Sequence, residues 1–182
     1  MRAIRRLPSL STLALNFYDE DWEAQGGACG TARVLRVRRW LHHCHRLSHL
    51  ELSVLRSVSA RKLLAAVAAA VGGRLRTLTL CDVQLPPTRD AAARDMCMLV
   101  GRYPCLEVLT LRLCAPYKME GSTANALSRG YLLAAPAVAA LCPVLREVLI
   151  TWEQASRGYH AATWLRVRAW PPLWKGLQYG CG

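Results

Sequence analysis

The hydrophobic positions of this chain form a short phrase that occurs five times. In the copy that ends at Ile150, apolar residues occupy Leu145, Val148 and Ile150, which are positions one, four and six of the phrase. The last two are spaced by two, which fits one face of a β-strand and not the helical period of 3.6 residues. The other copies place leucine at all three positions: Leu10, Leu13 and Leu15; Leu47, Leu50 and Leu52; Leu75, Leu78 and Leu80; Leu106, Leu109 and Leu111. Each copy is therefore predicted to form a short strand.

These strands are predicted to stack side by side in one sheet. A strand with one apolar face cannot bury that face alone, so each copy needs neighbouring copies and a return segment packed behind the sheet. The leucines at position one lie 28 to 39 residues apart, which leaves room for a crossover between parallel strands. We therefore expect an α/β fold: an open, curved parallel sheet of five or six strands with helices on the convex side, forming part of a solenoid.

The segment leading into the phrase resembles a known family. Cys142-Pro143-Val144-Leu145, and without the proline Cys44-His45-Arg46-Leu47, are similar to the Cys-Pro-x-Leu-x-x-Leu-x-Leu phrase of cysteine-containing leucine-rich repeats in F-box proteins and ribonuclease-inhibitor-like folds. The other copies hold Leu7, Gly72 and Tyr103 at the cysteine position. The resemblance covers roughly residues 7–151, and its long intervals exceed the ~20–29 residues of such repeats, so loop insertions are expected.

The resemblance implies a protein-interaction scaffold, including the substrate-recognition part of an F-box-like ubiquitin-ligase adaptor. An F-box would precede the repeats, whereas the first copy begins almost at Met1 and lacks the polar capping element of a terminal repeat. The chain is therefore expected to begin within a solenoid. Five to six irregular repeats are expected to form one domain over residues 1–170, with 171–182 as a C-terminal tail.

The segments between the copies are predicted to be helices and loops. Residues 32–43, 60–71 and 89–102 carry apolar residues at helical spacing and are predicted to be helices. Residues 115–130 are rich in glycine, serine and proline and are predicted to be a loop. Pro136 then either opens a short helix or kinks a longer one.

Beyond Thr151 the phrase is lost, but residues 164–170 alternate and predict a sixth strand. Its inward residues would be Leu165, Val167 and Ala169. Its other face would present Trp164, Arg166, Arg168 and Trp170. Because aromatic rings stack on bases and guanidinium groups pair with phosphates, an alternative function is nucleic-acid binding at this basic Arg/Trp surface. The same alternation also fits a strand that simply ends a sheet.

The net charge of +12 comes mostly from arginine, with lysine only at Lys62, Lys118 and Lys175. Arginine suits planar contacts to carboxylate or phosphate, but an arginine-rich composition also follows from a GC-rich coding sequence. Arg33, Arg36 and Arg39 line one side of the predicted helix 32–43. This pattern is typical of the wet side of an outer helix, and also of a helix that binds nucleic acid or an acidic partner.

The eight cysteines include no Cys-x-x-Cys pair, and the chain has no Asn-x-Ser/Thr site and no signal-peptide core. These features favour a reducing compartment, the cytoplasm or the nucleus. The longest apolar runs are well short of the ~20 residues of a membrane span. No contact with a membrane is expected.

The sequence carries no catalytic motif that we can identify. Gly-x-Ser-x-Gly, a phosphate-binding glycine loop and His-Glu-x-x-His do not occur. The run His42-His43-Cys44-His45 and the acidic residues 19–23 lack the spacing of zinc and calcium sites. We therefore expect a protein that is not an enzyme and that binds no cofactor or metal.

The candidate binding site follows from the alternation of strand side chains. Residues between the buried leucines must point away from the helices, toward the concave face of the sheet. They are small, polar or singly charged, and we expect a protein partner there. The predicted partner-binding residues are His49, Glu51, Ser53, Thr77, Thr79, Val108, Thr110, Arg112, Glu147 and Thr151, accompanied on the same face by Thr12, Ala14, Asn16, Cys81 and Leu149. His49, Glu51, Arg112 and Glu147 are the expected determinants of specificity.

Overall fold

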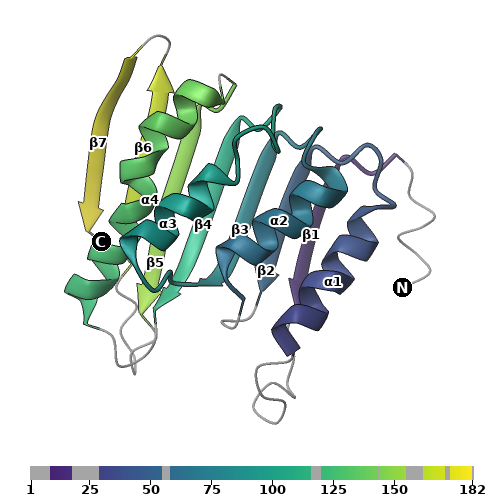
Figure 1. Cartoon of the computed structure of the whole chain (residues 1–182), viewed down its shortest axis with the longest axis horizontal. Helices are drawn as coiled ribbons and strands as arrows, with labels where there is room; N and C mark the ends of the chain where they lie inside the picture. Colours follow the sequence, from purple (N-terminus) through teal and green to yellow (C-terminus); the bar gives the residue numbers. More distant parts are fainter. Residues whose placement is uncertain are drawn as a thin grey trace.

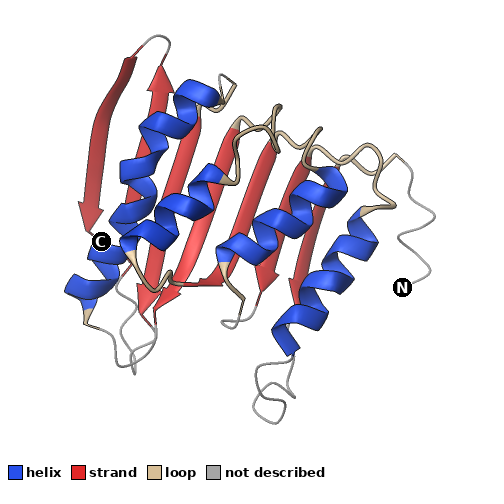
Figure 2. Cartoon of the chain, in the orientation of Figure 1, coloured by secondary structure: helices blue, strands red, loops and turns tan. Residues whose placement is uncertain are grey.

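The structure, a computed structural model, describes residues 9–17, 29–54, 58–115, 120–142, 144–154, 162–170 and 173–181. The strands form one seven-stranded open sheet whose spatial order follows the sequence (Figure 1). They are β1 (Thr12–Phe17), β2 (His49–Val54), β3 (Thr77–Gln84), β4 (Val108–Ala115), β5 (Glu147–Gln154), β6 (Ala162–Trp170) and β7 (Leu173–Cys181). The helices are α1 (Cys29–Leu41), α2 (Ala60–Val71), α3 (Arg89–Cys97) and α4 (Gly121–Leu141), and they cover the same face of the sheet (Figure 2).

Strands β1 to β5 are parallel, and each contains the last two apolar positions of one copy of the leucine phrase. The register joins equivalent residues of successive copies. One row of Cα partners runs Leu13, Leu50, Leu78, Leu109 and Val148, and a second runs Leu15, Leu52, Leu80, Leu111 and Ile150. The predicted short strands and their parallel pairing are therefore confirmed for all five copies.

Strands β6 and β7 depart from the expectation of an all-parallel sheet, because both pairs, β5–β6 and β6–β7, are antiparallel. Only residues 155–161 separate β5 from β6, whereas a parallel crossover needs about a dozen residues or more. The predicted strand around 164–170 is present with this reversed direction. The segment 173–181 forms β7, whereas a C-terminal tail is expected from the sequence over 171–182.

The core lies between the sheet and the helices. The inward residues of β2 to β5 are almost fully buried, with Leu50 2% exposed and Leu78, Leu109 and Val148 0% exposed. Helix α2 contributes the predicted stripe of Leu63, Leu64, Val67 and Val71, all buried. Leu13 and Leu15 of β1 are only partly buried, because β1 lies at the edge of the sheet.

In the four copies where the structure describes it, the residue at the cysteine position lies between the helix and the following strand. Cys44 and Cys142 are buried there, as small apolar groups often are. Gly72 and Tyr103 occupy this position in the two intervening copies, and together they allow the two turns to pack against each other. A Cβ at Gly72 would lie 2.5 Å from the Arg102 carbonyl oxygen, while the buried Tyr103 ring donates its hydroxyl hydrogen to the Leu64 carbonyl oxygen. The two turns can therefore stack closely without a cysteine.

The predicted bounds of the helices agree best with the structure where apolar residues recur regularly at helical spacing. Helix α2 has the predicted bounds, α1 begins three residues earlier than predicted, and α3 ends at Cys97 and not at 102. The prediction of a loop over 115–130 was wrong from Gly121 onward, since α4 runs from there to Leu141. Its buried residues Ala124, Tyr131 and Val138 recur every seven positions, and this packing outweighs the local preferences of glycine and proline. Pro136 lies inside the longer helix.

Candidate functional site

The open face, defined here as the sheet face that no described helix covers, presents the residues predicted to bind a partner. In β2, Leu50 and Leu52 are buried while His49 and Glu51 are exposed and Ser53 is half-buried. The same alternation holds in β1 and β5, whereas in β4 the predicted partner-binding residue Thr110 is buried, and in β3 Cys81 is buried. Side chains of a strand change face at every step, so burial on one side places the intervening residues on the other.

The register gathers the predicted residues into rows that run across the strands. The first row of Cα partners is Thr12, His49, Thr77, Val108 and Glu147. The second is Ala14, Glu51, Thr79, Thr110 and Leu149. A third row contains the pairs Asn16 with Ser53, Ser53 with Cys81, and Arg112 with Thr151. Residues more than ninety positions apart in sequence are thus brought onto one surface.

A β-bulge interrupts the third row. The pairing of β3 with β4 shifts between Leu80 and Val83, so that Cys81 and Asp82 together oppose Arg112. Asp82 has φ 57°, in the left-handed region, where a non-glycine backbone stores ~1–3 kcal/mol of strain. The bulge keeps Val83 buried and leaves the Asp82 side chain exposed. The sequence phrase gave no signal for this feature, because the leucine spacing before it is unchanged.

Around the bulge, charged and polar side chains from three strands surround the Cys81 thiol. The Cys81 Sγ lies 3.8 Å from Glu51 Oε1 as a weak hydrogen bond. Burial raises the pKa of the Cys81 thiol above its ordinary value, and the Arg112 guanidinium and a hydrogen bond with Ser53 oppose that rise. The thiol is therefore held protonated at neutral pH and is a poor nucleophile. This arrangement offers hydrogen-bond donors and acceptors to a partner, and Glu51 and Arg112 add exposed charges of opposite sign.

The other predicted determinants lie farther out on the same surface. His49, at the start of β2, shares a 2.8 Å hydrogen bond between its Nδ1 and the Ser48 hydroxyl. Glu147, at the start of β5, is half-buried. Between them Thr77 and Val108 are half-buried and leave a low surface. The four expected specificity residues therefore share one face, but only Glu51 and Arg112 are grouped around Cys81 in the described contacts.

Strand β6 extends the same sheet, and its register with β5 is defined. Arg168 is paired with Glu147, Arg166 with Leu149, and Trp164 with Thr151. The side chains of Trp164, Arg166, Arg168 and Trp170 lie outside the described residues. The basic Arg/Trp surface therefore stays a prediction.

Nothing in the described part of the chain forms a metal site, since no three His, Cys, Asp or Glu side chains gather there. The Cys44 Sγ donates instead to the Trp40 carbonyl oxygen at 3.8 Å, and burial raises the pKa of its thiol. The acidic residues 19–23 lie outside the described residues. Of the described helices, none combines the length and the apolar character that crossing a membrane requires.

Comparison with known proteins returned no matching family model, no matching curated protein and no matching solved structure. The resemblance to cysteine-containing leucine-rich repeats therefore rests on the motif residues themselves. The functional assignment rests on the residues of the open face and on the distribution of charge.

Proposed function

We propose that the chain is part of a leucine-rich-repeat solenoid that serves as a scaffold and binds a protein partner on its open face. The observation that carries this proposal is the register. Equivalent residues of five parallel strands line up in rows, with leucines toward the helices and small or polar residues away from them. A surface built this way is long, low and rich in hydrogen-bonding groups.

The chemistry of these rows suits an extended segment or a shallow protein surface. Thr77, Thr79 and Thr151 are half-buried and can donate and accept hydrogen bonds without blocking close approach. Glu51 on β2 and Arg112 on β4 add exposed charges of opposite sign, which favour a partner with complementary charges and disfavour others. Small polar residues also keep such a face soluble when it is unoccupied.

The family resemblance supports a more specific version of the proposal. In F-box proteins of this type the repeats recognise the protein that is to be ubiquitinated, so the open face here is proposed to select a substrate in the cytoplasm or the nucleus. The Cys142-Pro143-Val144-Leu145 motif is the feature that supports it. This version assigns the scaffold to ubiquitination, but the proposal that the open face binds a protein does not depend on that assignment.

Charge reversal on the open face tests the scaffold role. A photo-crosslinking amino acid at Thr79 would capture the partner, and calorimetry with the purified partner would then give the dissociation constant. Glu51→Arg and Arg112→Glu should each weaken binding at least about tenfold, because like charges then meet across a desolvated contact. Arg94→Glu, an exposed position on α3, is the control and should change the affinity by less than about twofold.

The fold should survive these substitutions, since Glu51 and Arg112 are exposed and outside the core. Circular dichroism and the unfolding midpoint check this point. If both reversals leave the affinity unchanged while Arg94→Glu abolishes it, the partner binds the helix side and the proposal is wrong.

A further inference from the structure

Basic and acidic residues lie on different faces of the sheet in the described part of the chain from α1 to the start of β3. From Ala24 to Cys81 the sequence contains one acidic residue, Glu51, and the structure places it exposed on a strand that has its helices on the other side. Helices α1 and α2 and the turns that follow them carry arginine, lysine and histidine and no carboxylate. Among the described residues, α1, α2 and the turns that follow them therefore carry basic side chains without an acidic one, while the acidic residues 19–23 lie outside the described residues.

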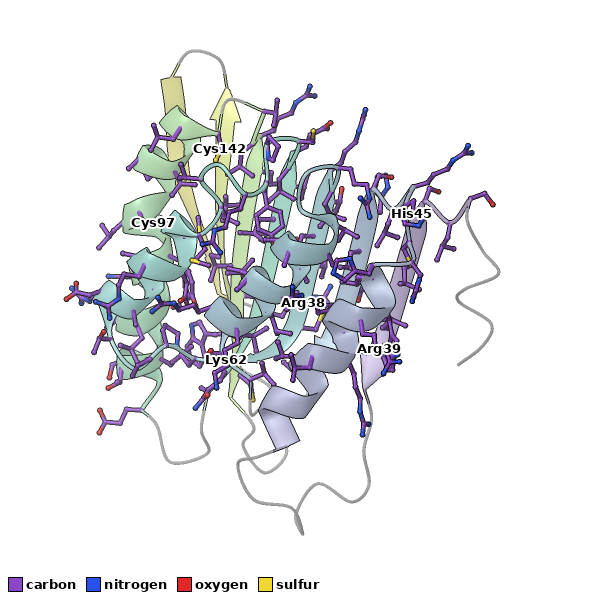
Figure 3. The ribbon with its side chains drawn as sticks, turned by 45° about the vertical axis from the view of Figure 1, so that its right-hand side comes forward. Arg38, Arg39, His45, Lys62, Cys97 and Cys142 are labelled. Atoms are coloured by element: carbon purple, nitrogen blue, oxygen red, sulfur yellow. The ribbon has the colours of Figure 1, made fainter. Side chains whose placement is uncertain are left out.

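Five cations define this surface, which we call the basic face. They are Arg36, Arg38 and Arg39 on α1, Arg46 in the turn before β2, and Lys62 on α2. All five are exposed. Helices α1 and α2 lie side by side (Figure 1), and Figure 3 shows Arg38, Arg39 and Lys62 on the helix layer in front of the sheet.

These cations have no structural partners among the described side chains, unlike other basic residues of the chain. Arg74 donates to the Cys44 and Ala70 carbonyl oxygens, and Arg76 pairs with Glu107 at 3.6 Å. None of the five residues of the basic face makes a comparable contact within the described residues. No described side chain therefore pairs with these five charges.

The chemistry of the surface favours a phosphodiester strand over other polyanions. Four of the five cations are arginines, whose planar group can form paired hydrogen bonds with phosphate oxygens. His42 and His45 are exposed just beyond the end of α1, and aromatic rings of this kind can stack on unpaired bases. An anionic membrane would need an apolar face to insert, whereas Leu35 is the one large exposed apolar residue described on α1 and α2.

We propose that the basic face binds single-stranded nucleic acid through its phosphate backbone, without sequence preference. This function is independent of the protein partner on the open face, because the two surfaces lie on opposite sides of the sheet. A scaffold with both surfaces would bring a protein to a nucleic acid.

The test measures the fluorescence anisotropy of a labelled mixed-sequence oligonucleotide of single-stranded RNA over a series of salt concentrations. Each phosphate contact of a single strand contributes about −0.7 to the slope of log K against log salt concentration. The variant Arg36→Gln/Arg38→Gln/Arg39→Gln should therefore reduce the slope by about 2 and weaken binding at low salt at least about tenfold.

The matched control is Arg94→Gln/Arg102→Gln/Arg146→Gln, which removes the same charge from exposed arginines of the C-terminal half. It should keep the slope and change the affinity by less than about threefold. Circular dichroism confirms that both variants fold, and Arg36→Lys/Arg38→Lys/Arg39→Lys should restore most of the binding because the charge is retained.

Three outcomes would overturn the proposal. The first is no binding of the oligonucleotide by the unmodified chain at low salt. The second is an equal loss in the two glutamine variants, which would make net charge the cause and not the basic face. The third is binding to phosphatidylserine vesicles, but not to the oligonucleotide, that is lost in the α1 variant; the surface would then be a membrane contact.

Discussion

At the scale of single residues, the most consequential polar group is Asp95, a buried carboxylate between α3 and α4. Its side chain is 6% exposed, and Oδ2 accepts a 3.0 Å hydrogen bond from the Tyr131 hydroxyl. Burial raises the pKa of Asp95 above its ordinary value, although the Tyr131 hydrogen bond and the charges of Arg61 and Arg94 act in the opposite direction. The protonated carboxyl group is therefore more favoured in the folded state than in the unfolded chain.

The variant Asp95→Asn should be at least as stable as the parent chain at pH 7, because a neutral amide can still accept the Tyr131 hydrogen bond and carries no desolvated charge. Asp95→Leu should instead lose ~1–3 kcal/mol, since the buried Tyr131 hydroxyl then has no acceptor. Urea unfolding of the three proteins measures the difference. A destabilised Asp95→Asn together with a stable Asp95→Leu would contradict this account.

The same group predicts a pH dependence of stability. Because the pKa of Asp95 is higher in the folded state than the ordinary value of 3.8, the protonated form contributes stability that is fully present below 3.8. This contribution is lost as the pH rises through the folded pKa. The unfolding free energy of Asp95→Asn should therefore exceed that of the parent increasingly as the pH rises through this interval, and the difference should be constant above it.

At the scale of elements, some helices and strands could be predicted from the local sequence pattern, whereas others depend on tertiary packing. The bounds of α2 could be predicted because leucine and valine follow one helical stripe and two glycines end it. The first half of α4, from Gly121 to Gly130, could not, since its glycine and serine residues favour a loop and the contacts with α3 stabilise the helix there. The alternation also predicted most of the open face, whereas the Cys81–Asp82 bulge depends on the pairing of β3 with β4.

Gly130 of α4 packs directly against α3, with no space for a side chain. A Cβ there would lie 2.7 Å from the Arg89 carbonyl oxygen and 2.9 Å from the Ala92 Cβ. Gly130→Ala should therefore push the helices apart and cost ~1–3 kcal/mol. Gly73→Ala is the control, because a Cβ at Gly73 meets nothing within 4 Å. Thermal unfolding measures both, and equal midpoints would mean that α4 adjusts freely.

At the scale of the whole molecule, stability should be shared among neighbouring repeats and decline toward β1. In a stack of this kind each unit contacts chiefly the units beside it. Here β1 pairs with β2, β2 with β3, and β3 with β4. Leu13 and Leu109 occupy equivalent positions of the leucine phrase. Leu109 is 0% exposed between its partners Leu78 and Val148, whereas Leu13 is only partly buried.

Leu109→Ala should cost ~2–5 kcal/mol, because it leaves a cavity that the layers on both sides share. Leu13→Ala should cost less than half as much, since the edge of the sheet already exposes part of that side chain. Urea unfolding gives both values, and hydrogen exchange should show the amides of β1 opening before those of β4. Equal costs for the two substitutions would mean that β1 is packed as tightly as the centre of the sheet. The stability of the first repeat would then have to come from contacts other than those between β1 and β2.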